Sequence, residues 1–190
     1  MSDPAAPLYR PTILAGPSGV GKGTVVAALR RRRPEVWLSI SVTTRTPRPG
    51  ERDGVHYHFV TDAQFDDLVA TDGLLEWAEY GHHRYGTPAA AVRAQAAAGV
   101  PVLLELDLAG VRQARDRLAG AQTVLLAPPS REELRRRLAH RGTETPAAMA
   151  TRLAIAEAEL AAADEFDRVI VNDRVERAVE ELVDFMGLCA

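Results

Sequence analysis

The 190-residue sequence contains a single cysteine, a single lysine and no long apolar run. Because Cys189 is the only cysteine, no disulfide can form within the chain, and nothing points to an oxidising compartment. No segment approaches the roughly 20 consecutive apolar residues of a membrane helix, and residues 1–11 lack the apolar stretch of a signal peptide. We therefore expect a cytoplasmic protein that does not associate with membranes.

An excess of positive charge is also absent. The net charge of -3 argues against broad, nonspecific binding to nucleic acid. With 46% hydrophobic and 26% charged residues, the composition is that of a soluble globular protein. The length suits one domain with a sizeable core. We expect one compact domain that does not bind nucleic acid, and the sequence gives no indication of its oligomeric state.

Lysine is so rare that its one position is informative. The chain has 23 basic residues, of which 22 are arginine and one is Lys22. A lysine ammonium is a compact charge that fits into a ring of backbone N–H groups, whereas a guanidinium is a wide planar fork. Lys22 follows Gly16 and Gly21 in GPSGVGKGT, residues 16–24, which matches the phosphate-binding pattern G-x-x-x-x-G-K. An apolar run precedes this segment and a helical pattern follows it, as the motif requires.

In such a loop, backbone N–H groups and the N-terminus of the following helix bind phosphate oxygens, and the lysine reaches the outer phosphates. The alternative is an ordinary strand-to-helix turn, which the lone lysine disfavours. The residues expected to bind the phosphates of ATP are Gly16, Pro17, Ser18, Gly19, Val20, Gly21, Lys22, Gly23 and Thr24.

The expected metal site departs from the usual pattern. The motif normally continues with a serine or threonine that holds Mg²⁺, but this chain has Gly23. Either Thr24 supplies the hydroxyl group or water completes the coordination shell. Asp107 ends the segment LLELD, where an acid could bind Mg²⁺ through water. A lone acid at a strand end is more often a helix cap, so the proposed Mg²⁺ role of Asp107 requires that the glycine-rich loop binds phosphate.

Short apolar runs alternate with helical patterns along the chain. The predicted buried strands are 12–15, 101–107, 122–127 and 169–171. The predicted helices are 22–33, 62–70, 88–98, 130–140, 146–163 and 174–185. Ser130 and Glu133 form a candidate capping box. The alternation predicts an α/β fold, a parallel sheet with helices on both faces. Between residues 37 and 87, strand patterns at 37–42 and 55–60 and irregular loops dominate, so we expect a small mixed insert.

Arg45, Arg48 and Tyr57 lie on a proline-stiffened loop and suit a phosphate monoester dianion. The surrounding segment TTRTPRPGERDGVHYHF is similar to the GMP-binding segment of guanylate kinases. The segments LLEWAE, RYGTP, LLELD, LAPPS, RRRLAHRGTE and VIVND also resemble that family, in the right order. The resemblance covers nearly the whole chain and implies a P-loop NTPase core, a GMP-binding insert and a helical lid. The implied boundaries are 8–38, 88–128 and 164–190 for the core, 39–87 for the insert and 129–163 for the lid.

The resemblance implies roles for individual residues. The expected ligands of the GMP phosphate are Arg45, Arg48, Tyr57 and Tyr85. The residues expected to contact guanine or the rest of GMP are Ser41, Glu76, Thr87 and Glu105. A carboxylate at position 76 suits guanine, because N1 and N2 of that base are donors, whereas hydroxyl groups can donate to O6. On its own, Glu76 could be a surface acid of an amphipathic helix, but its position between two family motifs disfavours this alternative.

The resemblance also implies the catalytic groups. With Lys22 and Arg45, the lid arginines Arg137, Arg141 and Arg152 would stabilise the charge that develops on the transferred phosphoryl group. Asn172 would lie near the adenine of ATP, and Mg²⁺ would accompany the nucleotide. At least one member of the run Arg135 to Arg137 must be an ordinary surface residue.

Three departures from the family pattern qualify these expectations. Guanylate kinases commonly have Gly-Asn where this chain has His82-His83, glutamine in place of Ala109, and a hydroxyl residue in place of Gly23. We interpret the two histidines as ordinary loop residues, whereas Ala109 and Gly23 together indicate weakened activity or a specialised role. The expected reaction is ATP + GMP giving ADP + GDP. The alternatives are a related kinase with another phosphorylated acceptor, which Glu76 and Tyr85 disfavour, and a binding module without catalysis, which Lys22 disfavours.

Overall fold

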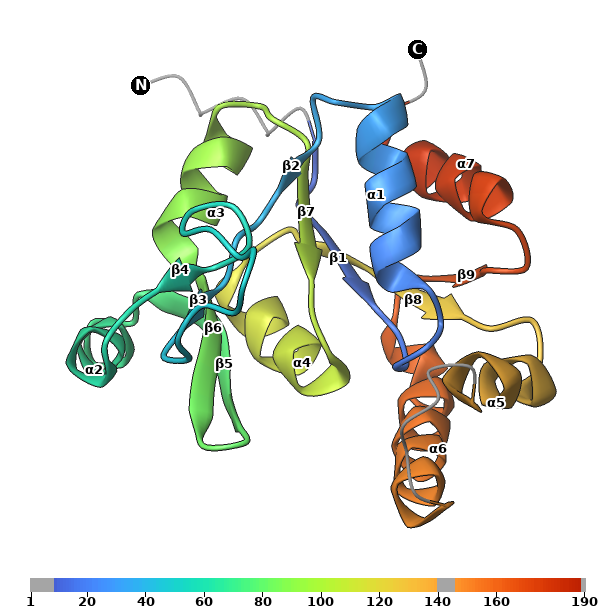
Figure 1. Ribbon diagram of the computed structural model, residues 1–190. Coiled ribbons are helices and arrows are strands. Elements are labelled where there is room, and N and C mark those ends of the chain that lie inside the picture. The colour runs from blue at the N-terminus through green and yellow to red at the C-terminus, as the bar shows by residue number, and fades with distance from the viewer. Residues whose placement is uncertain (1–8, 140–145, 189–190) are drawn as a thin grey trace.

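The computed structural model describes residues 9–139 and 146–188. A five-stranded parallel sheet, in the order β2-β7-β1-β8-β9, lies at the centre of the fold (Figure 1). Its strands are β1 (Thr12–Ala15), β2 (Trp37–Leu38), β7 (Val102–Glu105), β8 (Gln122–Ala127) and β9 (Arg168–Val171). The expected α/β fold with a parallel sheet is therefore confirmed.

Both faces of this sheet are covered by helices. The central strand β1 is completely buried, and its side chains alternate between two cores. Leu14 packs with α1 and α7, whereas Ile13 and Ala15 pack with α3 and α4 on the other face. The bounds of these helices are α1 (Lys22–Arg32), α3 (Ala89–Ala97), α4 (Leu108–Arg117) and α7 (Val175–Phe185).

A second, four-stranded sheet has the order β4-β3-β6-β5 and mixes parallel and antiparallel pairs. Its elements are β3 (Val42–Thr43), β4 (His58–Phe59), α2 (Asp62–Ala70), β5 (Leu74–Tyr80) and β6 (His83–Pro88). Val42, Phe65 and Leu74 form its small core, with the Trp77 ring 6.0 Å from that of Phe65. Arg84 anchors α2 to β6, because its guanidinium binds Asp62 and Asp66.

Several sequence expectations are wrong in this region. The segment 37–42 is not one strand, because the chain leaves the large sheet after Leu38 and enters the second sheet at Val42. Only His58 and Phe59 of the predicted strand 55–60 are paired with a neighbouring strand. The alternative interpretation of LLEWAE, an amphipathic helix with Glu76 on its surface, is also wrong, because the segment forms strand β5 and pairs with β6.

Helices α5 (Arg131–Ala139) and α6 (Pro146–Ala161) lie on the opposite side of the large sheet from the second sheet (Figure 1). Leu134 and Leu138 of α5 pack against Ala156 of α6. A short 3₁₀ helix, η1 (Ala163–Glu165), precedes β9. None of the described helices is long and apolar enough to cross a membrane.

The predicted capping box at the start of α5 is only half formed. The backbone N–H of Glu133 donates to Ser130 Oγ at 3.1 Å. The Glu133 carboxylate, however, accepts hydrogen bonds from Arg136 and Arg137 on its own helix. Two charged donors one turn away compete more strongly for this carboxylate than the cap backbone does, because charge-assisted hydrogen bonds are the stronger ones.

Parallel strands place their carboxyl ends at one edge of a sheet, where ligands of such folds bind. The carboxyl ends of β1, β7 and β9 lead directly to Gly16, Leu106 and Asn172. The fold therefore gathers the glycine-rich loop, the LLELD segment and the VIVND segment at one edge.

Candidate active site

The glycine-rich loop joins β1 to α1, as the sequence predicts. Gly16, Gly19 and Gly21 have φ values of 147°, 84° and 100°, in a region that residues with a side chain rarely adopt. Helix α1 begins at Lys22, so its unpaired N–H groups and the positive end of its dipole face the loop. The Lys22 ammonium folds back and donates to the carbonyl of Gly16. This arrangement can bind a chain of phosphate groups.

Two side chains from later in the sequence support the backbone of this loop. Asn172 is buried, and its Nδ2 donates to the Val20 carbonyl at 2.8 Å. Arg137 Nη1 donates to the same carbonyl at 3.1 Å, and its Nη2 donates to the Asn172 carbonyl at 3.0 Å. A Cβ atom at Gly21 would come within 2.6 Å of Asn172 Nδ2. Asn172 and Arg137 therefore fix the shape of the glycine-rich loop.

A first cavity lies at the N-terminus of α1, on the side of α5. The residues that line it are Gly19, Gly21, Thr24, Arg136, Arg137, Asn172, Asp173 and Val175. The structure thus brings Asn172 and Arg137 together with part of the predicted ATP site. Arg152 lies half-buried on α6, and Arg141 lies outside the described residues.

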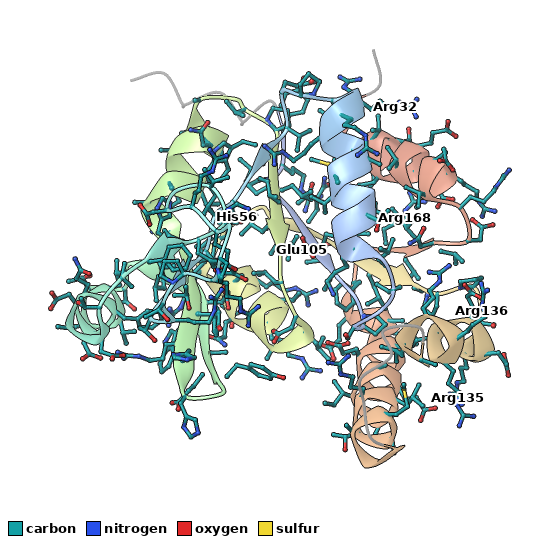
Figure 2. All side chains as sticks on the ribbon, viewed as in Figure 1. Arg32, His56, Glu105, Arg135, Arg136 and Arg168 are labelled. Carbon is teal, nitrogen blue, oxygen red and sulfur yellow. The ribbon has the colours of Figure 1, made fainter. Side chains whose placement is uncertain are left out.

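Two adjoining hollows form a second cavity between the large sheet and the second sheet. They share Ser41, Tyr57, Glu105, Leu106 and Asp107. The hollow nearer the loop is also lined by Lys22, and the other by Glu76 and Tyr85. In Figure 2, Glu105 lies between α1 and the segment that carries His56. One cavity therefore connects the phosphate-loop lysine to most of the predicted GMP site.

Glu76 is the buried acid of this cavity. It is 8% exposed, and the buried hydroxyl of Thr87 donates to its Oε1 at 2.6 Å. Burial raises the pKa of the Glu76 carboxyl and nearby Asp107 adds to the rise, whereas the hydrogen bond from Thr87 opposes it. Thr87 itself does not line the cavity, and its hydroxyl donates its hydrogen bond to Glu76 rather than to a ligand. The geometry thus makes Thr87 a partner of the acid.

Arg45 is held by an acid that the sequence analysis did not single out. Its Nη1 and Nη2 donate to the two carboxylate oxygens of Glu51 at 2.9 Å each, and Glu51 also accepts from the backbone N–H of Arg48. The hydrogen bonds from Arg45 and then from Arg48 lower the pKa of Glu51 to about 2. Among the described residues, the buried Arg45 Nε has no hydrogen-bond partner. The Tyr57 ring lies 5.4 Å from the Arg45 guanidinium carbon.

The two expected metal ligands line different cavities. Thr24 lines the cavity that contains Asn172, whereas Asp107 lines the one that contains Lys22. Asp107 also caps α4, because its Oδ1 accepts the Gly110 N–H at 2.7 Å. In the described part of the chain, no three acidic, histidine or cysteine side chains cluster in a way that could hold a metal ion. Asp107 thus fits a magnesium ion that is bound mainly by phosphate and water, because its second oxygen is not used by the cap.

Two further acids lie near Lys22. Glu105 is open to water, yet the surrounding protein raises the pKa of its carboxyl while Lys22 partly offsets the rise. Glu159 of α6, which the sequence analysis missed, also has a raised pKa because of burial, with Lys22 opposing and Asp107 adding to the effect. Helix α6 therefore brings an acid within electrostatic reach of the phosphate-loop lysine.

Most of the departures from the family pattern lie on the surface, and only His83, the first residue of β6, is half-buried. His82 occupies the turn between β5 and β6 with a φ of 67°, and it is exposed. Ala109 is exposed in the first turn of α4. A Cβ atom at Gly23 would meet no atom within 4 Å, so the loop has room for a side chain there. None of these positions blocks either cavity.

A strand, a glycine-rich loop and a helix that begins with lysine, on a parallel sheet, define a P-loop nucleotide-binding protein. A family model described as guanylate kinase matches residues 8–187. The guanylate kinase of Thermobifida fusca is 61% identical over 92% of this chain and 89% of its own length, and that of Streptomyces coelicolor is 56% identical over 96% and 93%. A crystal structure of guanylate kinase from Anaplasma phagocytophilum has a TM-score of 0.73 at 28% identity and covers 94% of this chain and 85% of its own. The chain belongs to the guanylate kinase family.

Proposed function

We propose that this protein transfers the γ-phosphoryl group of ATP to GMP and releases ADP and GDP. The observation that carries the proposal is the pair of adjoining hollows that share five lining residues, one lined by Lys22 and the other by the buried acid Glu76. Membership of the guanylate kinase family supports the same reaction. ATP and GMP are the two small-molecule substrates that these sites suit, and we place the reaction in the cytoplasm.

For ATP, we assign the phosphates to the loop 16–24. Lys22 leaves the Gly16 carbonyl and binds the outer phosphates when nucleotide is present. Asn172 and Arg137 hold the loop, and Asn172 also borders the cavity in which we place the adenine.

For GMP, we assign the phosphate to Arg45, Arg48, Tyr57 and Tyr85. Glu51 orients Arg45 through both Nη groups of its guanidinium. Glu76 accepts hydrogen bonds from guanine N1 and N2, with Thr87 as its support. Ser41 and Glu105 line the space between base and phosphate loop.

The chemistry requires alignment and neutralisation of charge more than proton transfer. A GMP phosphate oxygen is already ionised near neutral pH and attacks the γ-phosphorus in line, so no dedicated general base is needed. Lys22 and the arginines stabilise the charge on the transferred group. Mg²⁺, held in part by Asp107, would neutralise phosphate charge when it is bound with ATP.

We also propose that the parts of the fold divide this work. Residues 39–87 hold GMP, the core formed by 8–38, 88–128 and 164–190 holds ATP, and residues 129–163 act as a lid. Arg137, Arg141 and Arg152 belong to that lid and act on the phosphates when it closes. The closed lid excludes water, which prevents hydrolysis of ATP.

The proposal is tested by measuring ADP formation from ATP and Mg²⁺ with GMP, dGMP, AMP, CMP and UMP supplied separately. We expect turnover with GMP, alone or together with dGMP, and none with the other three. No turnover with any acceptor, despite measurable GMP binding, would overturn the proposal and favour a binding module that has lost catalysis.

A further inference from the structure

Helix α4 contacts the strand that carries Glu76 at several points. Strand β5 is an edge strand of the second sheet, so only one of its two sides is paired, with β6. Along the other side lie two side chains of α4. Gln113 Oε1 accepts the Trp77 N–H at 3.2 Å and Gln113 Nε2 donates to the Trp77 carbonyl at 3.1 Å. Arg117 Nη1 donates to the Leu74 carbonyl at 3.0 Å.

The two contacts bracket Glu76. Gln113 satisfies both backbone groups of the next residue, as a neighbouring strand would, and Arg117 holds the carbonyl two residues before it. The pairing of β5 with β6 has a register shift between Leu74 and Glu76. A strand that is irregular at this point needs support from its other side if its side chains are to keep one direction. Helix α4 supplies that support.

A third position of α4 faces the acid itself. Gly110 lies one turn before Gln113 and is buried, and its φ lies outside the left-handed region, so its backbone does not require glycine. A Cβ atom there would lie 3.2 Å from Glu76 Oε2 and 3.2 Å from Asp107 Oδ1. Both contacts are tighter than ordinary van der Waals distance, so an added methyl group would displace one of the carboxylates.

We propose that α4 sets the guanine selectivity of the site through two positioning residues, Gly110 and Gln113. Gly110 leaves the space that the Glu76 carboxylate occupies, and Gln113 fixes the strand beside it. The ligand class that this geometry selects is a 2-amino-6-oxopurine, because two adjacent donors, N1 and N2, need both carboxylate oxygens in one orientation. This inference rests on the proposed function, in which Glu76 binds guanine.

The test compares GMP with IMP, which lacks the 2-amino group and otherwise offers the same phosphate, ribose and O6. Binding of each nucleotide is measured by calorimetry without ATP for the original protein and for Gly110→Ala and Gln113→Leu. Gln95→Leu on α3 is the matched control. We expect the two α4 variants to lose about tenfold in GMP affinity and clearly less in IMP affinity, because IMP has only the N1 donor to lose, so their GMP preference falls. We expect Gln95→Leu to keep that preference, and ATP affinity to stay constant throughout.

A change that merely loosened the fold would weaken GMP and IMP alike, so an unchanged preference in both folded variants would overturn the proposal. If Gln113→Leu does not fold, Gly110→Ala still decides the question. Glu76→Gln in the same assay separates two failures. If it also leaves the GMP preference unchanged, the assignment of Glu76 is wrong. If it abolishes the preference while the α4 variants retain it, only the role of α4 is wrong.

Discussion

Replacing Glu76 by glutamine removes one negative charge from the second cavity and changes little else in size. The carboxylate has two oxygens for the N1 and N2 donors of guanine. A glutamine has one oxygen, and its NH₂ group would face one of those donors. Because the side chain is only 8% exposed, water cannot easily take the place of the lost acceptor.

The size of the effect follows from these contacts. A hydrogen bond to a charged group contributes ~1.5–3 kcal/mol, and a buried donor left facing a donor adds to the loss. We expect a total of about 3 kcal/mol, which is a factor of roughly 100 in GMP affinity. The KM for ATP should stay within about twofold, because Glu76 does not line the cavity at the N-terminus of α1.

A coupled assay for ADP, with GMP varied at saturating ATP and then ATP varied at saturating GMP, measures both KM values. Glu79→Gln is the matched control, since Glu79 lies on the same strand and is exposed. An equal rise in both KM values, or the same GMP effect in the control, would refute the assignment of Glu76 to the guanine.

Three further predictions follow from the same geometry. As the pH falls, the KM for GMP should rise with a midpoint above 4.5, because burial raises the pKa of Glu76. The neutral acid cannot accept hydrogen bonds from both guanine donors. A pH profile that is identical in Glu76→Gln would contradict this prediction. Glu51→Gln should raise the KM for GMP about tenfold and leave the KM for ATP unchanged, because Arg45 loses the partner that orients it. Steady-state kinetics at pH 7 test this prediction. At that pH the Arg45–Glu51 ion pair is intact, since the pKa of Glu51 is about 2 and the pair is lost only as the pH falls towards that value. Lys22→Ala should lower kcat by ~100-fold or more without loss of fold, as circular dichroism can check; normal turnover would remove the phosphate loop from the mechanism.

The fold could be predicted where the residues of one segment alone determine its secondary structure. Most of the segments 12–15 and 122–127 is a continuous apolar run, ILA in the first and VLLA in the second, and a strand buried on both faces needs such a run. The glycine-rich loop could be predicted for a similar reason, since its glycines and lysine are contiguous. The segment 37–42 could not, because its division between two sheets depends on pairing with residues more than 15 positions away.

The candidate site was likewise predicted only in part, because some of its contacts cannot be inferred from the local sequence. Arg45 and Tyr57 were predicted from their residue types and loop, and Glu76 from a family resemblance, whereas their supporting residues were not predicted. Gln113 lies 36 positions from Trp77, and nothing in either local sequence indicates their paired hydrogen bonds. Glu51 is closer to Arg45, but an acid in an arginine-rich loop is equally consistent with a solvent-exposed surface. Such residues are found only from the three-dimensional contacts that they make.

The most direct measurement follows the transferred group itself. The protein is incubated with GMP, Mg²⁺ and ATP labelled at the γ-phosphate, and the nucleotides are separated as the reaction proceeds. We expect the label to appear in GDP, in equal amount to the ADP that forms. Label that stays in ATP, or that is released only as inorganic phosphate while GMP is bound, would contradict the proposed phosphoryl transfer to GMP.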